Sequence, residues 1–188
     1  LTMRIDAGAH KGTKLIAPEG EDVRPTSDRA RQAIFNMLAH RFDAVRGARV
    51  LDAFAGSGAL GLEALSRGAE SLTVFETARP ALEALKRNIA ACHEIARTLV
   101  FSSDVRRPPQ AKLHKAFAPC SLVFLDPPYN KGLIPPTLAA LQEAGWLAPE
   151  ALIVAEMDAR EDLPELAGFA VEDERRYGKA KIVILRAA

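Results

Sequence analysis

The feature that most constrains the fold is a regular alternation of short apolar runs with helical patterns, which begins near residue 47. The apolar runs are rich in Val, Leu, Ile and Phe, as in strands that are covered on both faces. This alternation predicts a mostly parallel sheet with helices packed on both faces. The expected strands are 48–54, 71–76, 98–104, 121–126 and 151–157, and the expected helices are 59–68, 79–92 and 134–144.

The C-terminal part of the chain departs from this rhythm. Residues 169–178 and 179–187 have the pattern of two strands that meet at Tyr177, Gly178 and Lys179. A short glycine-containing connection between two strands predicts an antiparallel hairpin. We therefore expect a seven-stranded sheet of the α/β class in which this hairpin completes one edge.

The first 46 residues also differ from the rest. Residues 3–18 suggest a short β-hairpin, and residues 26–42 have the spacing of an amphipathic helix whose inward positions include Ile34 and Leu38. A segment of this size is too small to bury a core of its own. We therefore expect residues 1–46 to be an appendage, without independent stability, on a domain formed by residues 47–188.

The turn after the first predicted strand contains three glycines in a G-x-G-x-x-G pattern, which also occurs in dinucleotide-binding turns. Here, however, Asp52 lies four residues before Gly56, at the carboxyl end of the strand. Its carboxylate could receive the ammonium group of an amino-acid-like ligand. No phosphate-binding lysine follows the glycines, so the turn favours a ligand other than a dinucleotide.

Three successive predicted strands end in a carboxylate, namely Asp52, Glu76 and Asp104. The carboxyl ends of parallel strands share one edge of the sheet, where ligands bind. Glu76 is suited to accept both hydroxyls of a ribose, and Asp104 is suited to an adenine amino group. S-adenosylmethionine carries an ammonium, a diol and an aromatic amine in this order. The residues expected to bind it are Asp52, Phe54, Gly56, Ser57, Gly58, Glu76, Thr77, Asp104 and Val105.

The fourth predicted strand ends in an unusual turn, Asp126-Pro127-Pro128-Tyr129. An aspartate often folds back to accept the backbone N–H two residues ahead, but Pro128 has none. Pro127 also favours an extended Asp126. The stiff turn therefore presents the Asp126 carboxylate and the Pro127 carbonyl as paired acceptors for a flat –NH₂ group, and the Tyr129 ring could stack on a planar base. We expect Asp126, Pro127 and Tyr129 to be the catalytic residues.

Four stretches together resemble the ribosomal RNA small-subunit methyltransferase D family, within the amino methyltransferases that carry an Asp-Pro-Pro-Tyr turn. They are RPTSDRARQAIFNML (24–38), DAFAGSGALGLEALSRGA (52–69), FLDPPY (124–129) and ERRYG (174–178). The sequence departs from the family at residues 102–120 and around Pro164. The resemblance implies a Rossmann-like class I methyltransferase that modifies the exocyclic N2 amine of a guanine in 16S rRNA. It also implies that the substrate is an assembling small ribosomal subunit.

Such a reaction needs little covalent help because a sulfonium is already an activated donor, so alignment and electrostatics around the amine should dominate. We expect no metal ion and no covalent intermediate, and we expect Asp126 to accept the proton after the nitrogen has attacked. The target base must be unpaired or flipped out to reach the site. A basic rim beside the catalytic mouth is expected to contact the RNA through Arg24, Thr26, Arg29, Arg31 and Lys11.

Bulk properties limit the remaining possibilities. The formal net charge of +1 gives no sign of a large, unspecific phosphate-binding surface. Two distant cysteines and the absence of a closely spaced histidine pair predict neither a disulfide framework nor a zinc site. No secretory leader and no apolar run of roughly 18 residues is recognisable. We therefore expect a cytoplasmic monomer.

Three alternatives stay open from the sequence. A DNA adenine-N6 methyltransferase would use the same turn chemistry, although the expected single domain has no separate DNA-reading part. A protein glutamine-amide methyltransferase is disfavoured by aspartate rather than asparagine at position 126. A nucleotide-binding oxidoreductase is a candidate from another class because of the glycine pattern.

Overall fold

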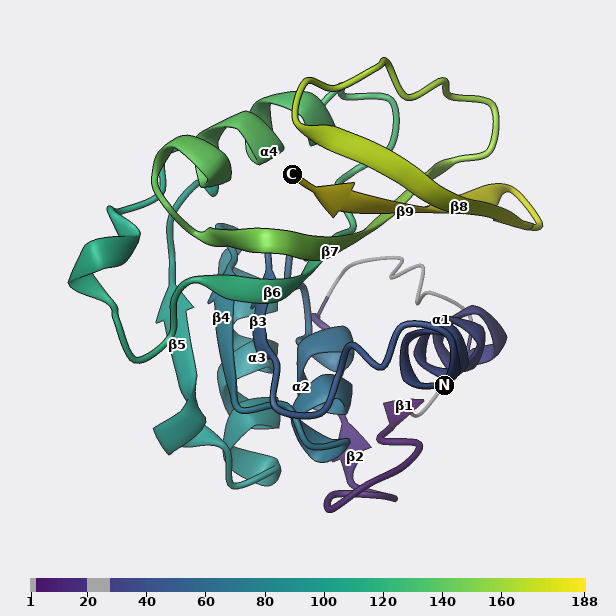
Figure 1. Cartoon of the computed structure of the whole chain (residues 1–188). Helices are drawn as coiled ribbons and strands as arrows, with labels where there is room; N and C mark the ends of the chain where they lie inside the picture. Colours follow the sequence, from purple (N-terminus) through teal and green to yellow (C-terminus); the bar gives the residue numbers. More distant parts are fainter. Residues whose placement is uncertain (1–2, 20–27) are drawn as a thin grey trace.

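The computed structural model describes residues 3–19 and 28–188. Its centre is a seven-stranded sheet with the strand order β5-β4-β3-β6-β7-β9-β8 (Figure 1). Five neighbouring strands are parallel: β3 (Arg49–Asp52), β4 (Ser71–Phe75), β5 (Thr98–Phe101), β6 (Cys120–Leu125) and β7 (Leu147–Asp158). The chain moves outward in one direction from β3 and in the other from β6. The carboxyl ends of β3 and β6 therefore form a topological switch point, where open α/β sheets bind ligands.

The C-terminal hairpin completes one edge of this sheet, as predicted. β9 (Ala180–Ala187) pairs antiparallel with β7, and β8 (Phe169–Tyr177) pairs antiparallel with β9 as the outermost strand. Gly178 and Lys179 form the connection.

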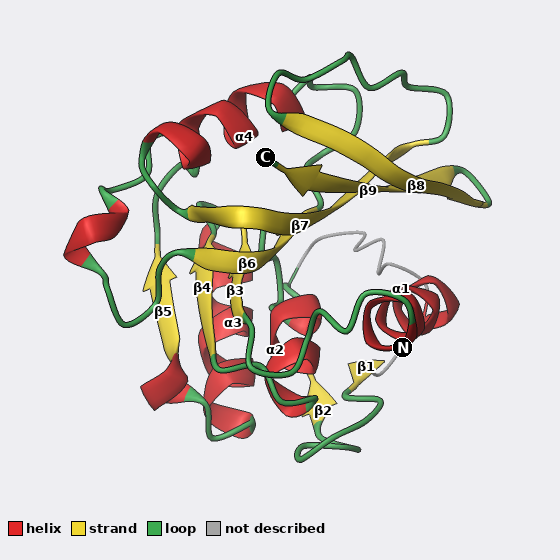
Figure 2. Ribbon diagram, viewed as in Figure 1, coloured by secondary structure: helices red, strands yellow, loops and turns green. Residues whose placement is uncertain are grey.

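Helices cover both faces of the sheet (Figure 2). One face carries α1 (Asp28–His40), α2 (Ala59–Ser66) and α3 (Arg79–Ala91), and the other carries α4 (Ile134–Glu143). Two short 3₁₀ helices, Ile95–Arg97 and Ala111–Leu113, precede β5 and β6. The predicted α/β class is confirmed. Within the described ranges, no helix combines the length and the apolarity that crossing a bilayer requires.

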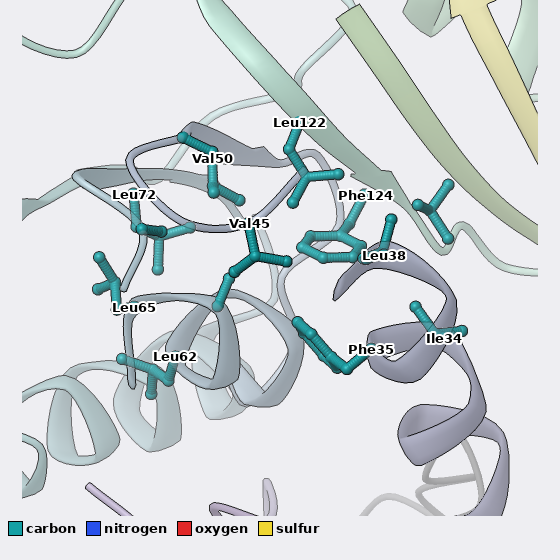
Figure 3. Close-up of a cluster of buried hydrophobic side chains, with 14 of the residues drawn as sticks. Ile34, Phe35, Leu38, Val45, Val50, Leu62, Leu65, Leu72, Leu122 and Phe124 are labelled. Carbon is teal, nitrogen blue, oxygen red and sulfur yellow. The ribbon is translucent and has the colours of Figure 1, made fainter. Parts of the chain in front are cut away.

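Alternating strand residues build two separate hydrophobic layers. Val50 of β3 joins the layer under α1, α2 and α3, whereas its neighbour Leu51 joins the layer under α4. Figure 3 shows the first layer, in which the ring of Phe35 from α1 lies 5.9 Å from the ring of Phe124 from β6. This contact fixes α1 against the strand that leads into Asp126-Pro127-Pro128-Tyr129, the predicted catalytic turn.

Two predicted strand boundaries differ from the structure by three residues or more. β5 ends at Phe101, three residues before Asp104, because its pairing with β4 stops where β4 itself ends at Phe75. β7 begins at Leu147 rather than at residue 151. A register shift opposite β6 and a positive φ of 59° at Glu150 allow this early start, which the apolar pattern does not reveal.

The N-terminal appendage packs against the helices that flank the sheet. Its hairpin pairs β1 (Met3–Arg4) with β2 (Lys14–Leu15). Ile34 and Leu38 of α1 are both buried, as their spacing predicted. Between β1 and β2, the carboxylate of Glu63 in α2 accepts backbone N–H groups at 2.8 and 3.2 Å. The appendage and the sheet thus share one hydrophobic layer.

One buried side chain of α3 joins the appendage to the glycine turn. The amide oxygen of Asn88 accepts the N–H of Ile16 at 2.8 Å, and its amide nitrogen donates to the carbonyl of Ile16 at 2.9 Å. The same nitrogen also donates to the carbonyl of Ser57 at 2.8 Å. The position of the hairpin is therefore linked directly to the turn after β3.

Candidate active site

A cavity of about 580 Å³ opens at the carboxyl ends of β3, β4 and β6 and beside the loop that follows β5. It lies at the switch point of the sheet, as expected for a ligand site in this architecture. The predicted residues that line it are Asp52, Phe54, Gly56, Ser57, Glu76, Thr77, Asp104, Val105, Asp126 and Pro127. The cofactor-type acids and the first half of the catalytic turn therefore share one cavity.

The glycine turn forms one wall of this cavity. Gly58 lies behind the wall, as the cap of α2, with φ at +86°. A Cβ atom there would come within 2.5 Å of Leu85 Cδ1, the end of a side chain that would have to shift, and the left-handed backbone conformation itself favours glycine at this position. Gly58 thus shapes the turn without lining the cavity.

Glu76 connects two backbone segments at the cavity mouth. Its Oε1 accepts the N–H of Gly56 at 2.9 Å, and its Oε2 accepts the N–H groups of Thr77 and Ala78, both at 2.8 Å. These bonds fix the orientation of the carboxylate and stabilise the glycine turn. The three bonds occupy most of the acceptor sites of the carboxylate, so the ribose-binding role stays a prediction.

Asp52 is buried on the cavity wall, with a residue exposure of 1%. Its Oδ1 has no hydrogen-bond partner within the described part of the chain. Burial raises the pKa of Asp52 to about 7, against the opposing effect of the Phe54 backbone N–H. A buried carboxyl oxygen without a partner is costly, and a cationic group in the cavity would remove that cost. The chemistry of this wall therefore fits the ammonium of S-adenosylmethionine.

This raised pKa predicts a specific dependence on pH. Between about pH 4 and pH 7 the folded protein retains a proton on Asp52 that the unfolded chain has lost, so this group stabilises the fold at low pH and the contribution falls as pH rises through 7. A cationic ligand favours the ionised form, so binding should release a proton. We expect the affinity for S-adenosylhomocysteine, which has the same ammonium, to rise about fivefold between pH 6 and pH 7, as the ionised fraction of Asp52 does.

Calorimetry of S-adenosylhomocysteine binding at about pH 6, in buffers with different ionisation enthalpies, measures this release directly. Asp52→Asn serves as the control, because an amide has no proton to release and its binding should be nearly independent of pH. Equal proton release in the parent protein and in Asp52→Asn would contradict the role of Asp52.

Asp104 lies in the loop after β5 and already has a cationic neighbour. Arg106 Nη2 lies 2.8 Å from Asp104 Oδ2, and the backbone N–H of Arg106 donates to Asp104 Oδ1 at 2.9 Å. These bonds hold the pKa of Asp104 below its usual range. Arg106 Nε also lies 3.1 and 3.2 Å from the two oxygens, so both are engaged and the adenine-binding role stays a prediction.

The catalytic turn divides between two cavities. Asp126 and Pro127 line the large cavity, whereas Tyr129 lines a neighbouring one of about 160 Å³. The two cavities share Pro127, Pro128 and Leu133, so they meet at the turn. The hydroxyl of Tyr129 donates to Glu156 Oε1 at 3.0 Å. The ring is therefore positioned at the second cavity rather than over the first.

Glu161, which lies in the loop after β7, fixes the turn from outside. Glu161 Oε1 accepts the N–H of Asn130 at 2.9 Å, and Glu161 Oε2 accepts the N–H of Asp158 at 3.0 Å. Two consecutive prolines supply no N–H groups for bonds within the turn, which makes these external bonds important. Our sequence analysis did not identify Glu156 or Glu161. Glu156 could have been found by the pattern that indicated Asp52 and Glu76, namely a carboxylate near the end of an apolar strand. No sequence pattern indicates Glu161.

The structure corrects the expected basic rim at Arg31, and the RNA contacts of the other residues stay a prediction. Arg31 is 2% exposed and pairs with Asp6 at 3.2 Å, so it forms part of the cavity wall and no solvent-facing rim. Lys11 is exposed, but its loop contacts the C-terminal end of α2, at the sheet edge opposite the cavity. Arg29 is exposed on the first turn of α1. Arg24 and Thr26 lie outside the described residues.

Metal binding has no apparent site in residues 3–19 and 28–188, where no three His, Cys, Asp or Glu side chains are grouped suitably for an ion. That the reaction needs no metal stays a prediction.

One further residue of the appendage, Met3, also lines the large cavity, although nothing in its sequence context indicates this.

Comparisons with known proteins cover nearly the whole chain. The family model described as conserved hypothetical protein 95 matches residues 3–186. The chain is 38% identical over 178 residues to ribosomal RNA small subunit methyltransferase D of Escherichia coli, with 94% of this chain and 86% of that protein covered. It is 36% identical over 187 residues to the putative rRNA methyltransferase YlbH of Bacillus subtilis, with 98% of each covered.

A solved structure gives the same result at the level of the fold. The putative methyltransferase yhhF from Escherichia coli superposes with a TM-score of 0.85 at 36% identity, and the match covers 100% of this chain and 98% of that one. The similarity includes the appendage as well as the sheet.

Proposed function

Because the chain belongs to the ribosomal RNA small-subunit methyltransferase D family, we propose that it methylates the exocyclic N2 amine of a guanine in 16S rRNA. Family membership makes it an S-adenosylmethionine-dependent rRNA methyltransferase. The choice of amine rests on one observation, namely that Asp126 and Pro127 line the same cavity as Asp52 and Glu76. The proposed substrate is an assembling small ribosomal subunit, and the proposed active form is a monomer.

S-adenosylmethionine supplies an activated methyl group when it is bound. In the proposed site Asp52 binds its ammonium, Glu76 its ribose hydroxyls and Asp104 its adenine amine. The unpaired Oδ1 of Asp52 supports the first assignment, and the fixed carboxylate of Glu76 supports the second. Phe54, Gly56, Ser57, Thr77 and Val105 complete the wall.

The catalytic turn acts on the substrate amine. The Asp126 carboxylate and the Pro127 carbonyl accept its two N–H groups, which directs the nitrogen lone pair away from the turn and toward the methyl group. After the nitrogen has formed its new bond, Asp126 accepts the surplus proton. No strong base is needed, because the nitrogen loses this proton only after it has become cationic.

Glu76→Ala should weaken S-adenosylhomocysteine binding by about 30-fold, since two charge-assisted hydrogen bonds to the ribose are lost and the glycine turn loosens. Isothermal titration calorimetry measures the effect. Glu83→Ala is a suitable control, because the side chain of Glu83 is 68% exposed on α3, outside the cavity. An unchanged dissociation constant in Glu76→Ala would overturn the ribose assignment.

The proposed function is tested by offering tritiated S-adenosylmethionine with small ribosomal subunits, free rRNA, DNA or protein, and then digesting the product to identify the modified unit. We expect N2-methylguanosine from the subunits. N6-methyladenine in DNA or methylated glutamine in protein would replace the proposal with one of the alternatives. A rise in melting temperature with NAD and none with S-adenosylmethionine would indicate an oxidoreductase.

A further inference from the structure

The smaller cavity beside the catalytic turn has the properties of a site for a planar ligand. Its wall combines prolines and aliphatic side chains with the Tyr129 ring and three acidic residues, Glu156, Glu161 and Asp162. A mostly apolar wall with few polar groups is typical of pockets that bind and orient a small ring system. Because it meets the large cavity at Pro127, a ring bound here would lie next to the acceptors that hold the reacting amine.

Glu156 is placed directly beside Asp126. Leu125 of β6 pairs with Ala155 of β7, so the next residues, Asp126 and Glu156, come side by side at the ends of parallel strands. Neighbouring strands lie about 4.8 Å apart, and side chains at paired positions point to the same face. The Tyr129 hydroxyl also orients Glu156 through its 3.0 Å hydrogen bond. Asp126 lines the large cavity and Glu156 lines the smaller one, so the two carboxylates lie on either side of the junction at Pro127.

We propose that the smaller cavity receives the target base and that Glu156 selects guanine by accepting its N1–H. This inference rests on the proposed function, in which Asp126 and Pro127 hold the N2 amine. In guanine the ring nitrogen next to the amine carries a hydrogen, whereas in adenine and cytosine the corresponding nitrogen is an acceptor. An ionised carboxylate can only accept, so it pairs with the N1–H of guanine and repels the ring acceptors of adenine and cytosine.

A neighbouring acid provides a matched control. Glu161 lines the same cavity, but its two recorded hydrogen bonds come from the backbone of Asn130 and Asp158. Replacing it by glutamine should loosen the turn and slow transfer for every base equally. Replacing Glu156 by glutamine changes what the base encounters, because an amide can donate to an adenine N1 as well as accept from a guanine N1–H.

The experiment uses small subunits reconstituted on 16S rRNA transcripts. The position that the parent enzyme methylates is mapped first, and a second transcript then carries adenine there. Tritium transfer to both particles is measured for the parent enzyme, Glu156→Gln, Glu161→Gln and Tyr129→Phe. We expect the guanine-to-adenine rate ratio to fall about 100-fold in Glu156→Gln and to stay at the parent value in Glu161→Gln. Tyr129→Phe should lower the ratio about fivefold, since the carboxylate loses its orienting hydroxyl.

The outcomes separate the two proposals. If the parent enzyme forms N2-methylguanosine but Glu156→Gln keeps the parent ratio, Glu156 does not select the base and only the inference fails. If the parent enzyme forms no N2-methylguanosine, the proposed function fails, and the inference with it. Titration with S-adenosylhomocysteine checks each variant for an intact site. If Glu156→Gln does not bind S-adenosylhomocysteine, the test relies on Tyr129→Phe. A guanine-to-adenine rate ratio in Tyr129→Phe equal to that of the parent enzyme then overturns the inference.

Discussion

We expect Asp126→Ala to lower the rate of methyl transfer by about 10³-fold, which is the effect of removing one preorganised group that stabilises developing charge. The carboxylate is assigned to the substrate amine, so the loss should appear in the chemical step. Affinity for S-adenosylhomocysteine should stay within a few-fold of the parent value, because Asp52 and Glu76 supply the main polar contacts to that ligand. Single-turnover transfer of tritium and calorimetric titration measure the two quantities separately.

Asp126→Asn refines this test. The amide oxygen still accepts one N–H of the amine, but it carries no charge and cannot accept the proton as readily, so we expect a loss between those of the parent and of Asp126→Ala. Abolished binding of S-adenosylhomocysteine in either variant would contradict the assignment, since Asp126 would then support the cofactor and not the amine.

Gly8→Ala should cause the largest loss of stability. The loop between β1 and β2 passes so close to α2 that a Cβ at residue 8 would lie 1.9 Å from the Ser66 carbonyl oxygen, and φ is +87°. The loop must move away, which breaks the bond from the N–H of Ala9 to that oxygen and removes backbone partners from the buried Glu63. We expect a loss of about 4 kcal/mol in the free energy of unfolding, or roughly 10 °C in Tm.

Gly12→Ala is the matched control for this prediction. Gly12 lies in the same hairpin with φ at +86°, but no atom lies within 4 Å of its hypothetical Cβ. It therefore measures the cost of the backbone conformation alone, about 1 kcal/mol. Equal losses in the two variants, measured by urea unfolding, would show that contact with α2 contributes nothing.

The sequence was sufficient to predict the sheet, the hairpin and the acids at the strand ends. Strands such as β4 and β6 are buried on both faces, so their composition alone identifies them. Once the strands are parallel, topology brings Asp52, Glu76 and Asp126 to one edge, and no detailed packing is needed to predict that they meet.

The parts that could not be predicted depend on contacts between distant segments. The burial of Arg31 follows from its ion pair with Asp6, which lies 25 positions away in the chain. The bond from Glu161 to Asn130 spans 31 positions. The placement of Tyr129 at a second cavity depends on where the loop after β7 returns. None of these contacts leaves a periodic pattern in the sequence.

The appendage supplies Met3 and Arg31 to the wall of the large cavity, and Asn88 joins its hairpin to the glycine turn. Chimaeras in which this N-terminal segment is exchanged between relatives should therefore differ from their parents in function. Each exchange would replace part of the wall of the large cavity, so an altered affinity for the methyl donor should be inherited with the segment.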